Sequence, residues 1–299
     1  MHTSIKFYIF SYNRGTFLDH CVTSIEKCAP SSPIVIFDDT SNDPHTQEIL
    51  DGLSQRHTVI SSGKLSGHKH GGLYHNMQSA LEKMADDELF CFLQDDMQIV
   101  RPISEDDINY IHNFFQSYPD SGFLQPTFLK GATRSRDAEL IRYDSEGQVY
   151  FREQNKNSAG FYYSDICIST ASRLRECDWS FETGEPANEV KAKHLFSNRM
   201  GLMRDPFIMW LPYAPAYRGK LKTLALKLAE KTRNCGFYPF EIMSNAASEK
   251  LKTRSSETLP VAEDYLETIN PDLKKPWIYY PLQGSRFFKH LNRLELLFK

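Results

Sequence analysis

Residues 33–44 read PIVIFDDTSNDP. The apolar run at residues 33–37 shows no polar alternation, which is typical of a strand buried on both faces of a parallel sheet. Two aspartates end the run, and Asp43 followed by Pro44 has the form of a helix N-cap and first helical position. The stretch therefore predicts a buried strand, an acidic turn and the start of a helix.

The same order of elements continues on both sides of this stretch. Further β-prone runs lie at residues 6–10, 57–62 and 89–93. Segments with apolar residues at helical spacing separate them, at residues 17–25, 49–53 and 73–84. Strands that alternate with helices predict an α/β fold with a mostly parallel, Rossmann-like central sheet flanked by helices. Later in the chain, residues 185–201 are expected to be helical.

Polar side chains follow three of the predicted strands at the point where each strand ends. They are Tyr12 and Arg14, Asp38 and Asp39, and Asp95 and Asp96. Ligands of open α/β sheets bind beyond the carboxyl ends of the strands, so these groups are expected to form one site. The alternatives are that each acidic pair caps a helix or forms a solvated turn.

Each acidic pair suits a particular ligand. Asp38 and Asp39 could accept hydrogen bonds from a nucleoside, because an ionised carboxylate is an acceptor only. Asp95 and Asp96 repel each other unless a cation or a donor offsets their charge. Carboxylate oxygens together with substrate phosphates are typical ligands of Mg²⁺ or Mn²⁺.

Composition limits the class of protein. The chain has 40% hydrophobic and 13% aromatic residues, enough for a packed core, and its net charge of −3 argues against a nucleic-acid partner. Its six cysteines form no CxxC pair, and the first residues lack the apolar segment of a secretory signal. We therefore expect a cytoplasmic protein.

Charge is distributed unevenly along the chain. Residues 214–299 carry 15 Lys/Arg and 9 Asp/Glu, a net charge of +6. We expect residues 1–215 to form the catalytic domain and residues 216–299 a basic helical extension. The stretches 217–233 and 287–299 are basic and amphipathic, which predicts peripheral contact with the inner face of a membrane. The alternative is that these helices pack on the catalytic domain or on another subunit.

Residues 5–100 resemble the nucleotide-binding half of a GT-A glycosyltransferase, most closely glycosyltransferase family 2. The resemblance rests on an ordered set of motifs: Ser11-Tyr12-Asn13-Arg14, Asp38-Asp39-Thr40-Ser41-Asn42-Asp43, Gly71-Gly72-Leu73-Tyr74-His75-Asn76 and Gln94-Asp95-Asp96. The chain departs from the family at three positions. Gln94 replaces the first aspartate of the metal motif, Thr40 replaces a glycine and His75 replaces an arginine.

The resemblance implies roles for particular residues. Donor binding would involve Tyr12, Arg14, Asp38, Asp39, His75, Asn76 and Asp95. Asp96 would be the direct ligand of a divalent cation, with His68, Lys69, His70 or His75 also neutralising phosphate. Glu189 would be the general base, with Glu185 as the alternative. Trp179 would stack on a sugar, unless it is a core tryptophan.

The motifs together predict a sugar transferase. It would move a sugar from a nucleotide-activated donor to a glycan or lipid-linked acceptor, with inversion, in surface polysaccharide synthesis, and it would use Mn²⁺ or Mg²⁺. One alternative is a nucleotidyltransferase on a related α/β sheet. Another is a catalytically degenerate protein that binds sugar nucleotides, which the Gln94 substitution motivates.

Overall fold

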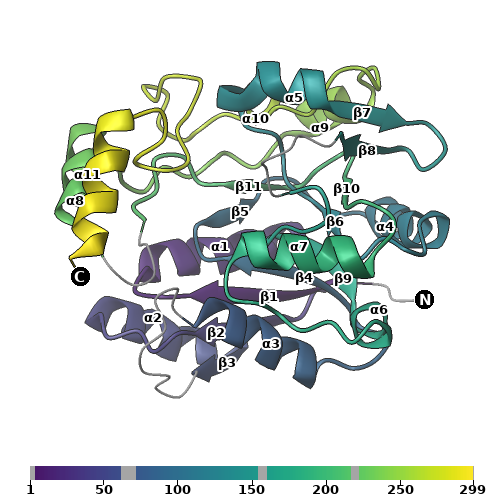
Figure 1. The fold of residues 1–299 in the computed structure, drawn as a ribbon, viewed down its shortest axis with the longest axis horizontal. Coiled ribbons are helices and arrows are strands. Elements are labelled where there is room, and N and C mark those ends of the chain that lie inside the picture. The colour runs from purple at the N-terminus through teal and green to yellow at the C-terminus, as the bar shows by residue number, and fades with distance from the viewer. Residues whose placement is uncertain (1–3, 62–71, 154–159, 217–221, 299) are drawn as a thin grey trace.

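The computed structural model describes residues 4–61, 72–153, 160–216 and 222–298. The expected phosphate-neutralising residues 68–70, and part of the first basic stretch at residues 217–221, lie outside these ranges. No helix in the described ranges is long and apolar enough to cross a membrane. Figure 1 shows a large central sheet with helices packed against it.

The main sheet of the described chain has nine strands in the order β3-β2-β1-β4-β9-β6-β10-β8-β7. Seven of the nine run in one direction, because only β9 and β8 are reversed relative to their neighbours. The strands are β1 (Lys6–Ser11), β2 (Ile34–Asp38), β3 (Thr58–Ser61), β4 (Leu89–Gln94), β6 (Leu124–Gln125), β7 (Ile141–Asp144), β8 (Val149–Arg152), β9 (Cys167–Thr170) and β10 (Gly201–Leu202). A separate pair joins β5 (Met97–Ile99) to β11 (Ile208–Trp210).

Helices cover both faces of this sheet. One face packs against α1 (Gly15–Cys28), α2 (Pro44–Ser54) and α4 (Glu105–Ser117), and the other against α3 (Leu73–Lys83), α6 (Ala171–Glu176) and α7 (Glu185–Leu195). The remaining helices are α5 (Arg134–Leu140), α8 (Leu224–Thr232), α9 (Asn245–Lys252), α10 (Ala262–Tyr265), α11 (Arg286–Leu297) and the 3₁₀ turn η1 (Gly131–Thr133).

The predicted N-terminal half is confirmed. Alternate residues of β1 enter opposite cores: Phe7 and Ile9 face α1, whereas Tyr8 and Phe10 face α3. This is why β1 is apolar from Phe7 to Phe10 without polar alternation. Asp43 caps α2, since its carboxylate accepts the Thr46 N–H at 2.8 Å.

The predicted helix at residues 185–201 is wrong in its second half. Helix α7 ends at Leu195, Phe196 is already extended, and Gly201 begins strand β10. The reason is tertiary: Ser121 pairs with Asn198, and the Gly201 N–H donates to the Phe123 carbonyl. Pairing with the sheet therefore overrides local helical propensity.

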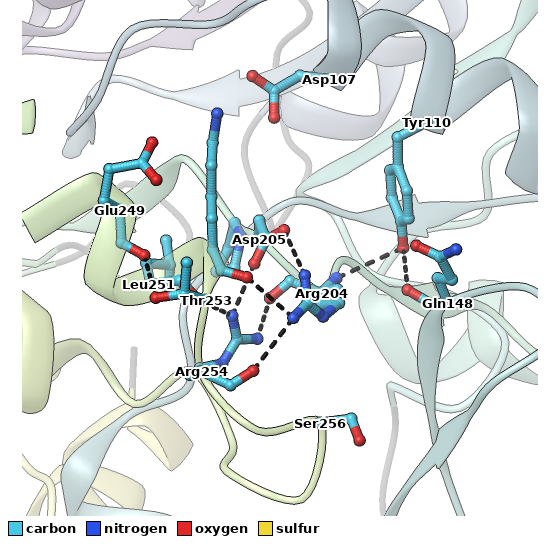
Figure 2. A network of polar contacts seen from close by, with 12 residues as sticks. Asp107, Tyr110, Gln148, Arg204, Asp205, Glu249, Leu251, Thr253, Arg254 and Ser256 are labelled. Carbon is cyan, nitrogen blue, oxygen red and sulfur yellow. Dashed lines mark hydrogen bonds and ion pairs between the residues drawn. The ribbon is translucent and has the colours of Figure 1, made fainter.

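A polar network ties the C-terminal third of the chain to the sheet domain (Figure 2). The Arg254 guanidinium pairs with Asp205 at 2.6 Å and donates to the Arg204 carbonyl. The Arg204 guanidinium in turn donates to the carbonyls of Lys252 and Arg254 at 2.9 and 3.1 Å. These reciprocal contacts hold the segment after α9 against the loop between β10 and β11.

The C-terminal third also completes a hydrophobic core. Trp277 is fully buried in a cluster with Phe17, Val100, Phe128 and Met209. The expected boundary at residues 215/216 therefore does not separate two cores, although it stays a prediction as a boundary of function.

We predict that Trp277→Ala lowers the free energy of unfolding by about 3–5 kcal/mol, because it removes a buried indole from this shared core. Chemical denaturation followed by circular dichroism measures the change. Phe287→Ala is the control, since that side chain is 69% exposed and should change stability little. A loss of stability no greater than that of the control would mean that the C-terminal third folds separately.

Candidate active site

Three strand ends meet at one edge of the sheet, as the sequence predicts. In the strand register Ser11 lies opposite Asp38, and Phe10 lies opposite Gln94. The turns after β1, β2 and β4 are therefore neighbours. All three predicted polar clusters converge there.

Arg14 joins the first and third of these clusters. Its guanidinium forms an ion pair with Asp95 and a second one with Asp96, the latter at 2.8 Å. Asp95 is fully buried and also accepts from the Ser11 hydroxyl at 3.1 Å and the Tyr12 N–H at 3.2 Å. Arg14 thus offsets the repulsion between two adjacent carboxylates.

Burial and charge compete at this cluster. Burial disfavours the charged guanidinium, but the carboxylates of Asp95 and Asp96 outweigh it and raise the pKa of Arg14 above its usual value. Burial disfavours the charged form of Asp95 as well and so raises its pKa, although Arg14 opposes that shift. The group is stable only as a unit, because each charge needs its partner.

The second cluster holds its own loop. The Asp38 carboxylate accepts from the Ser41 N–H at 2.8 Å and the Ser41 hydroxyl at 2.5 Å. Asp39 accepts the Gly72 N–H at 2.7 Å, which brings the start of α3 to the sheet edge. A Cβ at position 72 would lie 2.2 Å from Asp39 Oδ1, so this approach requires glycine.

The two predicted donor-binding residues on α3 differ in environment. His75 is exposed, whereas Asn76 is buried. Neither the amide oxygen nor the amide nitrogen of Asn76 has a hydrogen-bond partner among the described residues. A buried amide without partners is costly, and a bound ligand could satisfy it.

A cavity of about 440 Å³ lies next to this edge. Gln94 at the end of β4 is part of its wall, so the cavity borders the acidic cluster. Lys130, Asp165 and Glu185 contribute the charged groups on which the argument below depends.

Neighbouring structure positions the side chains of Glu185, Asp165 and Lys130 at the cavity. Gly184 adopts a φ of +109° and Pro186 follows Glu185 in the first turn of α7, so Glu185 opens the helix beside the cavity. Asp165 precedes β9 and accepts from the Tyr74 hydroxyl at 3.0 Å. Lys130 follows Leu129, which pairs with Val261 from the C-terminal third.

The titration of these groups is coupled through their charges. Burial raises the pKa of Glu185 above its usual range, the Asp165 carboxylate raises it further, and Lys130 opposes the rise. Burial also raises the pKa of Asp165. Burial lowers the pKa of Lys130 to about 8, although Asp96 and Glu185 oppose that shift.

Aromatic rings enclose the Lys130 ammonium. Its Nζ lies 3.8 Å from the ring centre of Trp210 and 5.2 Å from that of Tyr279. Tyr279 belongs to the C-terminal third, so that segment helps to place a charged group of the cavity. Lysine and carboxyl groups with perturbed pKa values inside a cavity are typical of catalytic sites.

Glu189 has a different environment from Glu185. Its carboxylate accepts backbone N–H groups of Gly160, Phe161, Tyr162 and Tyr163 at 2.9–3.3 Å. It therefore fixes the segment that leads to Asp165. The structure places Glu185, and not Glu189, in the cavity wall.

The residues that the sequence analysis missed lie far apart in the chain. Asp165, Lys130 and Trp210 belong to no local motif, and only the short apolar run at residues 166–168 could have drawn attention to Asp165. Trp179 is buried against Phe123, Tyr163 and Phe196, as a core tryptophan would be.

One atom of the acidic cluster suits a divalent cation. Asp96 Oδ1 is buried and accepts no hydrogen bond from the described residues. Those residues contain no group of three or more His, Cys, Asp or Glu side chains that could hold a metal by themselves. Mg²⁺ is commonly held by one or two carboxylates together with substrate phosphates, and one orphaned carboxylate oxygen fits that arrangement.

No protein-family model and no curated protein matches the sequence. Solved structures with a similar fold include the following two. S. aureus TarS 1–349 in complex with UDP has a TM-score of 0.44 and 15% identity, over 83% of this chain and 69% of that chain. Mannosyltransferase PcManGT from Pyrobaculum calidifontis, in complex with GDP-Man and Mn²⁺, has a TM-score of 0.44 and 11% identity, over 68% of this chain and 57% of that one. The topology of the sheet itself confirms the α/β class, and the roles of the site residues stay predictions.

We predict that Arg14→Met lowers the free energy of unfolding by about 3–5 kcal/mol, because it leaves the buried Asp95 without its cation. Arg56→Met is the matched control: it breaks a more exposed pair with Glu26 and should cost about 0–1 kcal/mol. Urea denaturation of both variants at neutral pH measures the difference. Equal stability losses would contradict a central role for Arg14.

Proposed function

We propose that the chain is a glycosyltransferase that uses a nucleotide-activated sugar. The observation that carries this proposal is the position of the cavity. It adjoins an acidic, arginine-bridged sheet edge that suits a nucleotide, and it contains a carboxyl group with a raised pKa that suits an acceptor hydroxyl. The proposed donor-binding site at the sheet edge and the proposed acceptor-binding cavity are therefore adjacent, with Gln94 between them.

On the donor side, the proposal assigns the nucleoside to the loop that contains Asp39 and the buried Asn76 amide. The proposal places Tyr12, Arg14 and Asp95 beneath the bound nucleoside, and Asp38 supports the loop through Ser41. The exposed His75 lies at the rim. Arg14 is already paired with carboxylates, so its part is to hold Asp96 in place.

Asp96 would hold a divalent cation, Mn²⁺ or Mg²⁺, through its orphaned Oδ1. When bound, such a cation supplies positive charge that stabilises the nucleoside diphosphate as it leaves. Lys130 adds protein charge to the same region, since Asp96 and Glu185 both act on its ammonium. Positive groups fixed where negative charge develops lower the barrier to the reaction.

On the acceptor side, we assign the general base to Glu185. Its raised pKa makes it a stronger proton acceptor than an ordinary glutamate while it still ionises near neutral pH. Glu189, the first candidate from the sequence, acts in this proposal as a positioning residue, because its oxygens hold four backbone N–H groups. Direct attack by the deprotonated acceptor inverts the anomeric centre.

The acceptor would be a glycan or a lipid-linked sugar, and the pathway the synthesis of a surface polysaccharide. The expected cytoplasmic location is part of the same proposal. The nucleotidyltransferase and the non-catalytic binder remain the alternatives, and the next experiment separates all three.

We predict release of nucleoside diphosphate from a panel of UDP- and GDP-sugars, with and without Mn²⁺, in the presence of oligosaccharide or lipid-linked acceptors. Glu185→Gln should reduce turnover by roughly 10²–10⁴-fold and leave donor affinity nearly unchanged, because only the proton acceptor is lost. Glu182→Gln, at an exposed position of the preceding loop, is the matched control. A parallel assay supplies a nucleoside triphosphate and a sugar phosphate. Release of pyrophosphate there, without turnover of the sugar nucleotides, would favour a nucleotidyltransferase. Binding without turnover in either assay would favour a degenerate binder.

A second prediction concerns pH. A general base must be deprotonated, so kcat/KM should fall as the pH drops through the raised pKa of Glu185. Lys130→Met removes a charge that lowers this pKa, and should move the acid limb to higher pH. Asp165→Asn removes a charge that raises it, and should move the limb to lower pH. Shifts in the same direction would exclude Glu185 as the group that titrates.

A further inference from the structure

Helix α11 buries one polar residue and leaves most of its large apolar side chains exposed. Among its described residues, Asn292 is the one that is fully buried, and it accepts the hydroxyl hydrogen of Thr223 at 2.5 Å. The outward side chains include large apolar ones: Phe287 at 69%, Leu291 at 39%, Leu294 at 54% and Leu297 at 78% exposed. Phe288 packs inward against Leu282, but an ordinary surface helix would leave far fewer large apolar side chains outside.

Helix α8 lies beside α11 at one edge of the molecule (Figure 1) and extends this surface. Glu295 of α11 accepts the N–H groups of Leu224 and Ala225 at 2.8 and 3.2 Å, so it caps the start of α8. Leu224 and Leu228 of α8 are 72% and 48% exposed, whereas Leu226 and Ala229 are buried. We call the exposed apolar side chains of both helices, together with Phe298, the α8–α11 face.

Basic residues surround the apolar ones. The exposed cationic side chains of the two helices are Lys227, Lys231, Arg286, Lys289 and Arg293. The acidic residues of the same helices are engaged elsewhere: Glu230 pairs with Lys222 at 2.7 Å, and Glu295 caps α8. The α8–α11 face therefore presents apolar groups within a positive field.

This charge distinguishes between two possible occupants. A second copy of the chain bound by two-fold symmetry would place the same face against itself and bring like charges together. An anionic lipid bilayer has an apolar interior that can receive the exposed apolar side chains. Its negative headgroups can pair with the surrounding basic residues.

A continuous set of bonds connects the face to the sheet edge. Glu230 of α8 accepts the Ala216 N–H at 3.0 Å, and the carbonyl of the preceding Pro215 accepts from Arg14 at 3.3 Å. Arg14 is the residue that pairs with Asp95 and Asp96. The α8–α11 face is therefore attached to the part of the molecule that contains the candidate site.

We propose that the α8–α11 face docks on an anionic lipid bilayer, with Phe287, Leu291 and Leu294 inserted at the headgroup boundary and the basic residues on the phosphates. Docking does not depend on the proposed reaction, since it concerns binding alone. If the proposed reaction holds, docking favours a lipid-linked acceptor, because it brings the candidate site to the surface from which such a substrate is presented.

The test is co-sedimentation of the full chain with vesicles. We expect binding to phosphatidylcholine vesicles that contain phosphatidylglycerol at low salt, weaker binding as salt rises, and little binding to phosphatidylcholine alone, because screening acts over about 8–10 Å. Phe287→Ser with Leu294→Ser should weaken binding by about tenfold or more, since two large apolar side chains no longer insert. Lys289→Glu with Arg293→Glu should weaken it and flatten its salt dependence.

The matched control is Val190→Ser with Ile269→Ser, which removes two apolar side chains of similar exposure, 58% and 60%, outside the α8–α11 face. It should bind vesicles as the unmodified chain does. Thermal unfolding establishes that each variant is folded, and the charge-reversal pair tests the proposal without touching an apolar residue. Absence of binding at low salt, or equal weakening by the control pair, would overturn the proposal. So would a dimer in light scattering that Phe287→Ser with Leu294→Ser converts to a monomer.

Discussion

The ion pairs of Arg14 are the constraint on which the candidate site depends. Two adjacent carboxylates at the end of a buried strand repel each other, and one guanidinium that pairs with both offsets this repulsion. The same side chain reaches the carbonyl of Pro215, so it also connects the sheet edge to the chain that leads into α8. The position of the two aspartates, the charge balance of the sheet edge and its connection to α8 therefore depend on one residue, Arg14.

Much of the N-terminal half could be predicted from sequence, because its signals are local. Strands buried on both faces are apolar throughout, and Asp43-Pro44 marks a helix start by itself. The second half of the sheet could not be predicted in this way. Strands β6 and β10 are two residues long, and their pairing is decided by partners far away in the chain. The helix predicted at residues 185–201 is shortened for the same reason.

The candidate site likewise has one part that local sequence predicts and one part that it does not. The clusters at Arg14, Asp38 and Asp95 follow strand ends, so the α/β pattern was enough to bring them together. The cavity instead combines Lys130, Asp165 and Glu185, which come from distant segments of the chain and meet only in the folded structure. Spacing also could not distinguish Glu185 from Glu189. The difference lies in a set of backbone N–H groups that only the folded loop presents.

The core around Trp277 has a consequence for synthesis of the chain. Phe17 and Trp277 belong to one cluster, so this cluster closes only when almost the whole chain has left the ribosome. Synthesis from Met209 to Trp277 takes roughly 3–14 s at about 5–20 residues per second, and during this time Phe128 and Met209 lack part of their cover. A nascent chain in this state exposes apolar surface that a chaperone would recognise. Contacts of such long sequence separation also slow folding.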